Sequence, residues 1–174
     1  GYWSRGLGDV YKRQGLRDRV KVAGSGKIVS AYDIARVCAL GADWCNMARP
    51  FMFSLGCIQA RDCSSGHCPT GIATMDPSRY GAVSVSDRSE RVFNFQKNTR
   101  EALKELLEAT GLHHPSELTR RHIVRRLSAS KIKLADQIYP NVEESALLNN
   151  GFVKDPRLSV YWDRMDKSSF TPMN

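Results

Sequence analysis

The chain has 174 residues, of which 41% are hydrophobic and 25% charged, and both values are typical of a single globular domain. No apolar run is long enough to span a membrane, and the N-terminus lacks the charged, apolar and small-residue segments of a secretory signal. We therefore expect a cytoplasmic protein with no membrane partner. In that compartment the five cysteines are expected to be thiols or metal ligands rather than a disulfide framework.

Residues 1–14 carry part of the formal net charge of +8 but have neither helical nor strand periodicity. Within them, the stretch Leu-Gly-Asp-Val-Tyr-Lys-Arg-Gln resembles a translated sequencing adapter. We predict that this segment is not native and exclude it from the fold. On this hypothesis the chain is the C-terminal piece of a longer protein.

A strand, a glycine loop, a helix and a second strand are predicted in succession. The β-branched run Val20–Ala23 indicates a buried strand, and Gly24-Ser-Gly-Lys27 indicates a tight loop after it. Ser30 begins a capping box that predicts a helix over 31–40, and a second strand is expected over 42–48. This order predicts a βαβ unit with parallel strands.

The glycine loop is a candidate phosphate site, because free N–H groups beside a helix start attract anions. Gly26 allows close approach of the backbone, Ser25 adds a hydroxyl, and Arg49 at the end of the second strand adds a charged fork. In (β/α)8 barrels the loops after the last two strands form the usual phosphate cradle. A plain tight turn is the alternative for so short a motif.

Three thiols, Cys57, Cys63 and Cys68, follow an apolar lead-in over 48–56 that predicts a strand end and the first turn of a helix. Zinc sites usually need four ligands, paired at shorter spacing. Three thiolates suit an iron–sulfur cluster with three protein-bound iron corners, and the lack of a fourth favours [3Fe-4S] over [4Fe-4S]. Structural thiols, zinc and a disulfide or redox pair stay open as alternatives. Cys38 and Cys45 are expected to be small core residues.

A surface connection is expected over 72–86, followed by the longest helix, over about 88–110. Asp87 and Glu90 are the predicted capping box of this helix. Its apolar face is formed by Val92, Phe95, Thr99, Leu103 and Leu106.

Arginines alternate with apolar residues over 120–127, which predicts a short amphipathic helix with a solvated basic face. Nucleic-acid binding is not expected, because no aromatic stacking platform accompanies the charge. An acidic partner or an electron-donor protein is an intermediate possibility. The tail over 128–174 is expected to be a strap that docks on a larger body. The arginines concerned are Arg120, Arg121, Arg125 and Arg126.

The sequence resembles the FMN-binding domain of glutamate synthase, most closely the single-domain FMN-binding glutamate synthase-related proteins. The resemblance begins at about residue 16 and is most specific in the cysteine segment. It implies an α/β fold, the last two βα units of a (β/α)8 TIM barrel with the iron–sulfur loop, over 15–80. A helical C-terminal extension packed on the barrel is implied over 81–174. The matching segments are 21–28, 39–46, 48–59 and 63–72.

The resemblance also implies the cofactors FMN and a [3Fe-4S] cluster. Cys57, Cys63 and Cys68 would hold the cluster. The implied activity is formation of L-glutamate from 2-oxoglutarate and ammonia or glutamine-derived ammonia, with electrons passing from the cluster to FMN and as hydride to an imine. The catalytic residues would lie upstream, so this chain by itself is expected to be inactive. The FMN phosphate would be bound by Ser25, Gly26, Lys27, Ala48 and Arg49.

One departure from the family pattern concerns Pro50, which stands where the family often has glycine. Proline has no N–H to offer a phosphate.

Two other classes of function stay open beside the one that the resemblance implies. One is a small metal-binding interaction module with a basic partner-docking helix, and the other is a different FMN- or phosphate-binding barrel enzyme with structural cysteines.

Overall fold

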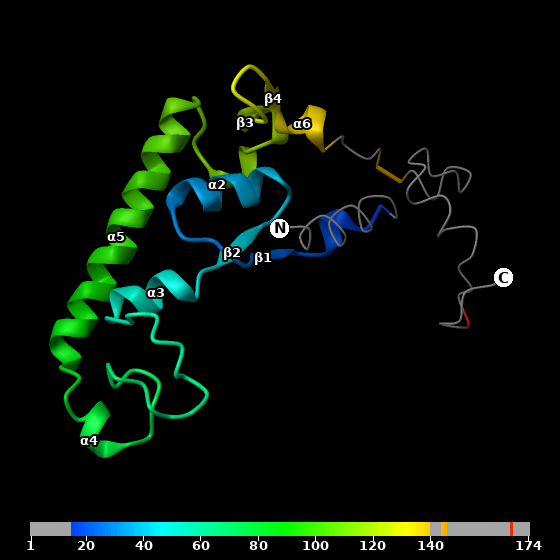
Figure 1. The fold of residues 1–174 in the computed structure, drawn as a ribbon. Coiled ribbons are helices and arrows are strands. Elements are labelled where there is room, and N and C mark those ends of the chain that lie inside the picture. The colour runs from blue at the N-terminus through cyan, green and yellow to red at the C-terminus, as the bar shows by residue number, and fades with distance from the viewer. Residues whose placement is uncertain (1–14, 140–143, 146–167, 169–174) are drawn as a thin grey trace.

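A computed structural model describes residues 15–139 together with 144, 145 and 168. The segment 1–14, predicted to be non-native, and most of the predicted tail strap lie outside the described residues. The described part begins with the short helix η1 (Arg17–Arg19) and runs through two small sheets and several helices (Figure 1).

The predicted βαβ unit is confirmed. Strand β1 (Ala23–Ser25) pairs in parallel with β2 (Trp44–Asn46), and helix α2 (Ala31–Ala39) connects them. Ala23 lies opposite Trp44 in this register. The expected strand bounds are wrong, because β1 begins at Ala23 rather than Val20 and includes Gly24, which is expected in the loop.

The strand is displaced because its pairing partner decides where it lies. Ahead of the ladder, the Asp43 N–H donates to the Val22 carbonyl oxygen at 2.8 Å, and the Val22 N–H donates to an Asp43 carboxylate oxygen at 2.7 Å. Gly24 fits inside the strand because α2 approaches it closely. A Cβ at this position would collide with Val37 Cγ1 and would lie 3.2 Å from Ala42 Cβ.

Helix α2 starts at the predicted capping box. The Ser30 hydroxyl accepts the Asp33 N–H at 3.3 Å, and the Asp33 carboxylate accepts the Ser30 N–H at 3.1 Å. The helix ends just before Gly41, whose φ of 111° few other residues adopt without strain.

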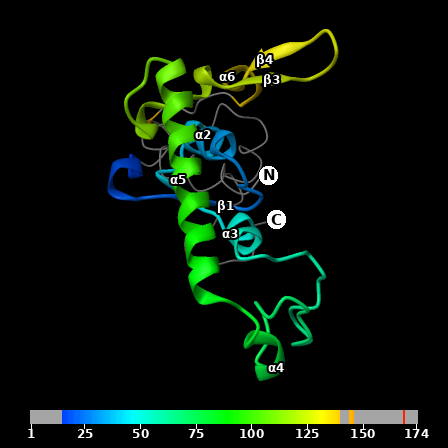
Figure 2. The same ribbon diagram turned by 90° about the vertical axis from the view of Figure 1, so that its left-hand side faces the viewer.

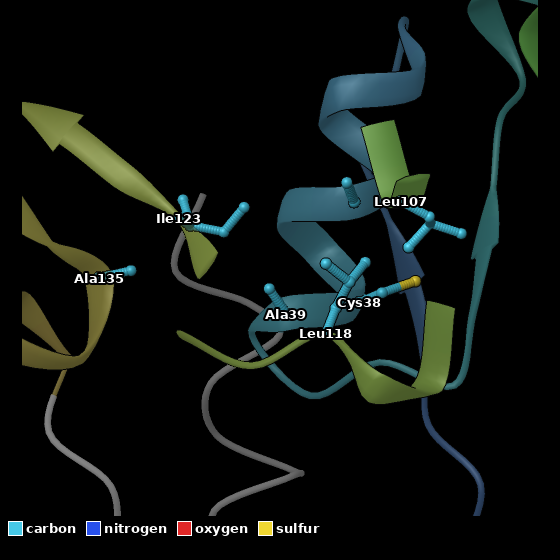
Figure 3. Close-up of a cluster of buried hydrophobic side chains, with 7 residues drawn as sticks. Cys38, Ala39, Leu107, Leu118, Ile123 and Ala135 are labelled. Atoms are coloured by element: carbon cyan, nitrogen blue, oxygen red, sulfur yellow. The ribbon is translucent and has the colours of Figure 1, made fainter. Parts of the chain in front are cut away.

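Two hydrophobic clusters lie against α2. The smaller one consists of Ile28, Val37 and Ala42, and it holds α2 against the β1–β2 sheet. The larger one joins α2 to the C-terminal half of the described chain (Figure 3). Its buried members are Ala35, Cys38, Ala39, Leu107, Leu118, Ile123 and Ala135.

Helix α3 (Arg49–Ser54) confirms the helical turn expected before the cysteines. It packs on the long helix α5 (Val85–Ala109) through Phe51 and Phe95, whose rings meet edge to face with centroids 5.1 Å apart. The residues of the predicted apolar face of α5 are half-buried. The most buried residue of the helix, Leu107, is not among those predicted.

The expected start of α5 is wrong. Ser84, not Asp87, is the N-cap, and its hydroxyl accepts the Asp87 N–H at 3.4 Å. The Asp87 carboxylate is then free to pair with Arg91 one turn on, at 3.9 Å. The expected surface connection before α5 also contains a short helix, α4 (Pro77–Tyr80), capped by Asp76.

The predicted amphipathic helix over 120–127 is wrong. The short helices η2 (Pro115–Glu117) and η3 (Arg120–His122) are followed by an antiparallel hairpin, in which Val124 pairs with Leu134. β-Branched residues favour strands, and the Ser-Ala-Ser sequence at 128–130 supplies the turn. The hairpin strands are β3 (Val124–Arg126) and β4 (Ile132–Leu134), and helix α6 (Ala135–Ile138) follows.

The basic face predicted there is partly used for structure. Arg120 is only 9% exposed and donates to the Tyr139 carbonyl oxygen at 2.9 Å. Arg125 donates to the Tyr139 hydroxyl at 2.7 Å, and Arg121 pairs with Asp136 at 3.3 Å. Within 81–139 the expected helical extension therefore contains a hairpin as well as helices.

Within the described part of the chain, no helix combines the length and the apolar character that crossing a lipid bilayer requires.

Candidate functional site

The loop after β1 is open to a ligand. Gly26 and Lys27 both have positive φ, of 92° and 55°, and Ser25 to Lys27 are exposed. A Cβ added at Gly26 would have no neighbour within 4 Å. The backbone is therefore accessible from outside at this turn, as binding of a phosphate requires.

The predicted phosphate-binding residues Ala48 and Arg49 follow β2 at the same edge of the sheet as the loop after β1. Ser25 lies opposite Asn46 in the parallel register, so the segments that follow β1 and β2 leave the sheet side by side. Ala48 is the N-cap residue of α3, and Arg49 is its exposed first residue. The role of all five residues in binding FMN stays a prediction.

Pro50 occupies the first turn of α3 and is buried. An N–H in this turn has no partner within the helix, so proline leaves the helix intact and only removes one donor from its N-terminus.

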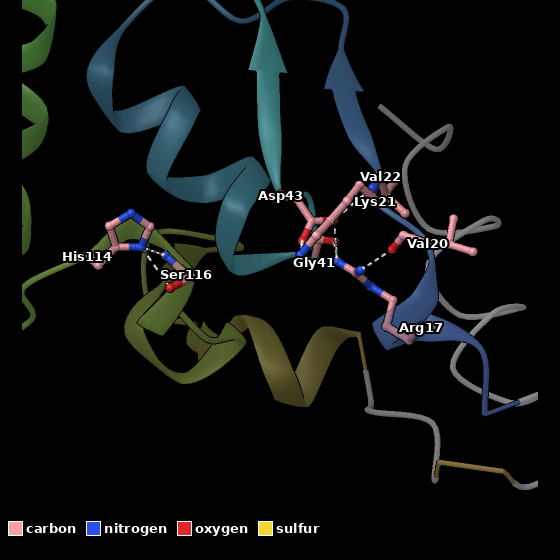
Figure 4. Close-up of polar contacts among 8 residues, drawn as sticks. All are labelled: Arg17, Val20, Lys21, Val22, Gly41, Asp43, His114 and Ser116. Carbon is pink, nitrogen blue, oxygen red and sulfur yellow. Dashed lines mark hydrogen bonds and ion pairs between the residues drawn. The ribbon is translucent and has the colours of Figure 1, made fainter.

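The opposite end of the sheet is held by polar contacts around Asp43 (Figure 4). Its carboxylate accepts from Arg17 at 2.8 Å and from the Val22 N–H, and Lys21 lies 3.4 Å away. Burial by itself would raise the Asp43 pKa, but the Val22 N–H and the two cations hold it below its ordinary value. This cluster stabilises the fold.

His114 also has a local structural role. Its Nδ1 caps η2 by accepting the Ser116 N–H at 3.2 Å, and it also lies 2.7 Å from the Ser116 hydroxyl (Figure 4).

The three-thiol loop lies between α3 and α4, at one end of α5, while the β3–β4 hairpin lies at the other end (Figures 1 and 2). Cys57 is half-buried, Cys63 is exposed and Cys68 is buried, and all three are free thiols. Across the described residues, no three His, Cys, Asp or Glu side chains are gathered so that they could hold one metal ion. An iron–sulfur cluster, by contrast, places each thiolate on its own iron.

Cys68 has the environment of a thiolate. The Thr70 hydroxyl lies 3.3 Å from its sulfur, and this contact, with the N–H groups of Ala73, Thr70 and Ile72, lowers the Cys68 pKa to about 7. N–H and O–H groups that point at sulfur stabilise its negative charge and tune the potential of an iron–sulfur centre. The donor set therefore fits the chemistry of a cluster ligand.

Cys57 shares part of this environment, since its sulfur accepts the Gln59 N–H at 3.5 Å. Its own N–H donates to the Met52 carbonyl oxygen at 2.9 Å, so the loop starts from the last turn of α3.

The second half of the loop is fixed by α4. Arg79 donates to the His67 carbonyl oxygen at 3.0 Å and pairs with Asp76 at 3.2 Å. At Gly71, φ is 76°, and a Cβ there would collide with the Arg79 carbonyl oxygen. The sequence prediction missed these supports, although the Asp-Pro pair at 76–77 is a helix-start signal that could have located α4.

The other two cysteines were predicted to be core residues. Cys38 is buried and Cys45 is half-buried, as expected. They form a hydrogen bond that lowers the pKa of Cys38 and raises that of Cys45. Both line a cavity of about 400 Å³ with Trp44 and Met47, which the sequence did not reveal.

Comparison with known proteins identifies the family. Residues 7–113 match the family described as "conserved region in glutamate synthase". The glutamate synthase large subunit-like protein YerD of Bacillus subtilis is 40% identical over 129 residues, which are 74% of this chain and 25% of the relative. The archaeal glutamate synthase (NADPH) of Methanocaldococcus jannaschii is 33% identical over 102 residues, 59% of this chain and 20% of the relative.

A more distant relative aligns with most of the chain. The glutamate synthase (NADH) of Schizosaccharomyces pombe is 28% identical over 165 residues, which are 91% of this chain and 7% of the relative. This chain thus spans a quarter or less of the length of these relatives. The family match over residues 7–113 and the 40% identity to YerD show that the chain belongs to the glutamate synthase family.

Proposed function

We propose that this chain is part of a glutamate synthase-type oxidoreductase that forms L-glutamate from 2-oxoglutarate and ammonia or glutamine-derived ammonia. The observation that carries the proposal is the loop Cys57–Gly71, in which three thiols follow helix α3, the short helix that comes after the parallel β1–α2–β2 unit. One of them, Cys68, is surrounded by donors that stabilise a thiolate.

The proposed fold of the whole enzyme is a (β/α)8 barrel, to which β1, α2, β2 and α3 contribute the last two strands and their helices. The parallel pairing of β1 and β2 around α2 supports this proposal. FMN would supply hydride transfer to an imine, and a [3Fe-4S] cluster would supply single electrons.

The chain's own residues would bind and orient these groups. Ser25, Gly26 and Lys27 would present hydroxyl, N–H and ammonium donors to the FMN phosphate, and Arg49 would add a guanidinium from the neighbouring strand end. Cys57, Cys63 and Cys68 would hold the cluster in the loop that follows. Arg49 at the start of α3 and Cys57 just after its end would place the two sites at opposite ends of one short helix.

The partners of this enzyme would be small-molecule substrates and an electron donor, which could itself be a protein. Formation of the product would need residues beyond this chain, since the chain spans a quarter or less of the length of its relatives. We therefore expect residues 15–174 alone to have no activity.

The test uses the full polypeptide that contains this chain, purified without oxygen. We expect flavin and iron–sulfur absorbance, three irons per chain, and glutamate formation that depends on 2-oxoglutarate and a nitrogen source. Changing Cys57, Cys63 or Cys68 to Ser should abolish cluster absorbance and activity.

The matched controls are Cys38→Ser and Cys45→Ser, which remove a thiol outside the loop and should keep the cluster. A colourless wild-type protein, or loop variants that retain three irons, would contradict the proposed cluster site.

A further inference from the structure

Arg88 lies in the first turn of α5, directly across from the start of the three-thiol loop. Its Nη1 is 2.8 Å, and its Cζ 3.2 Å, from the place where a Cβ on Gly56 would stand. The guanidinium therefore packs against the backbone of Gly56, the residue before Cys57. Glycine leaves room for it there, and the φ of 100° at Gly56 is one that residues with a Cβ rarely adopt.

The Arg88 side chain has an unused donor in this position. Its Nε atom is buried and has no hydrogen-bond partner in the described part of the chain. Within the described residues its Nη1 forms an ion pair with the Asp87 carboxylate at 3.6 Å, which is too long for a good hydrogen bond. A buried donor without an acceptor costs about 1–3 kcal/mol, so an acceptor is to be expected when the site is complete.

A charged donor is best satisfied by an anion, and the guanidinium lies beside Gly56, so an anion bound at the start of the loop would satisfy it. The neighbouring Cys57 is half-buried and already accepts an N–H from Gln59. A guanidinium is always charged and forms directional hydrogen bonds to anions, including sulfur-borne charge. We infer that Arg88 is a positioning residue for the Cys57 end of the iron–sulfur site, where it donates to the anionic sulfur of the bound centre and raises its reduction potential.

This inference rests on the proposed function, because it assumes that the loop binds a cluster. Reduction adds negative charge to the centre, and a fixed cation nearby favours the reduced form. Removal of the Arg88 charge should therefore lower the midpoint potential without removing any iron ligand.

The test compares Arg88→Gln, Arg88→Lys and the control Arg91→Gln in the full polypeptide that contains this chain. Arg91 is on the same helix, pairs with the same Asp87 and is more exposed, so its variant has the same change in charge away from Gly56. Iron per chain and the midpoint potential of the cluster are measured by redox titration, and thermal unfolding is followed in parallel.

We expect Arg88→Gln to keep three irons and to have a lower midpoint potential than wild type. Arg88→Lys should restore part of the difference, and Arg91→Gln should match wild type. A loaded Arg88→Gln protein with the wild-type potential would overturn this inference alone. A wild-type protein without a cluster would overturn the proposed function and the inference with it. If Arg88→Gln does not fold, Arg88→Met, which also removes the charge but keeps an apolar stem, takes its place, and a wild-type potential in that variant overturns the inference.

Discussion

At the scale of single residues, the contact between Thr70 and Cys68 shows how one hydroxyl changes the chemistry of a thiol. Four groups point at the Cys68 sulfur, and the Thr70 hydroxyl has the largest effect on its pKa, which falls from the ordinary 9.0 to about 7. A metal ligand must bind as the thiolate. Near neutral pH, about half of Cys68 is therefore already in the form that binds iron.

Replacement of Thr70 by valine should move the Cys68 pKa back toward 9.0, because valine has the same shape without the hydroxyl. Alkylation of Cys68 measured against pH by peptide mass spectrometry should have a higher midpoint in Thr70→Val than in wild type. Thr74→Val is a control on the same loop, since the Thr74 hydroxyl donates to the Gly66 carbonyl oxygen and not to sulfur.

The same shift makes stability depend on pH. The folded pKa of Cys68 is below its unfolded value, so its contribution to stability is complete above about pH 9 and is lost as the pH falls through about 7. Thr70→Val should therefore flatten the increase in stability between these limits. An alkylation midpoint unchanged by the substitution would show that the hydroxyl does not set this pKa.

At the scale of elements, the βαβ unit depends on the close approach of α2 to β1. Gly24 has no room for a Cβ, because Val37 and Ala42 occupy the space above it. The smaller cluster around Ile28 fills the same layer. The distance between α2 and β1 is therefore fixed by the side chains on the inner face of α2 and by the lack of a side chain at Gly24.

We expect Gly24→Ala to lower the free energy of unfolding by about 1–3 kcal/mol, the usual cost of overpacking a core. The variant Gly24→Ala/Val37→Ala should be less destabilised than the sum of its single changes, because removal of the Val37 methyl groups makes room for the new Cβ. Urea denaturation of all three variants measures this coupling. Strict additivity would mean that Val37 is not the obstacle.

The elements that could be predicted are those with strong local signals. The Ser30 capping box and the apolar face around Val37 predict α2, and the β-branched run over 20–23 before the glycine loop predicts the first strand. The hairpin over 124–134 was missed, because alternating Arg and apolar residues fit a helix as well as a strand over so short a length. The Ser84 cap was missed because Asp87 offered a second plausible start three residues later.

The candidate site could be predicted only where the spacing of residues in the sequence indicates a ligand or a turn. The three thiols of the loop have such spacing, and so do Gly24 and Gly26 at the end of β1. Arg88 and Thr70 do not, because their roles arise from packing between α5 and α3 and from the path of the loop. The supports of the loop in α4 depend on contacts that bring Arg79 back to His67.

At the scale of the whole molecule, α5 connects the three-thiol loop to the larger cluster. Leu107, near the C-terminal end of α5, is buried among residues of α2 and residues on either side of the hairpin, while Phe95, near the middle of α5, contacts Phe51 of α3. The two ends of the described structure are therefore linked by one helix (Figure 2).

Phe95→Ala should reduce stability by about 2 kcal/mol, somewhat less than for a fully buried ring, because Phe95 is half-buried. Hydrogen exchange in α3 and over 57–68 should become faster, since α3 loses its main aromatic contact with α5. Phe93→Ala is the matched control, because Phe93 is on the same helix but 66% exposed, and it should change stability by less than about 0.5 kcal/mol. Equal effects of the two changes would show that the ring pair does not couple α3 to α5.

The two hydrophobic clusters also differ in how far apart along the chain their members lie. The members of the smaller cluster lie between Ile28 and Ala42 in the sequence, whereas those of the larger one extend from Ala35 to Ala135. Closing a short loop costs less entropy than closing a long one, and contacts between near neighbours form faster. During synthesis on the ribosome, the β1–α2–β2 unit can therefore assemble as soon as it emerges. The hairpin end must wait for residues after α5, and until then the outer face of α2 stays uncovered.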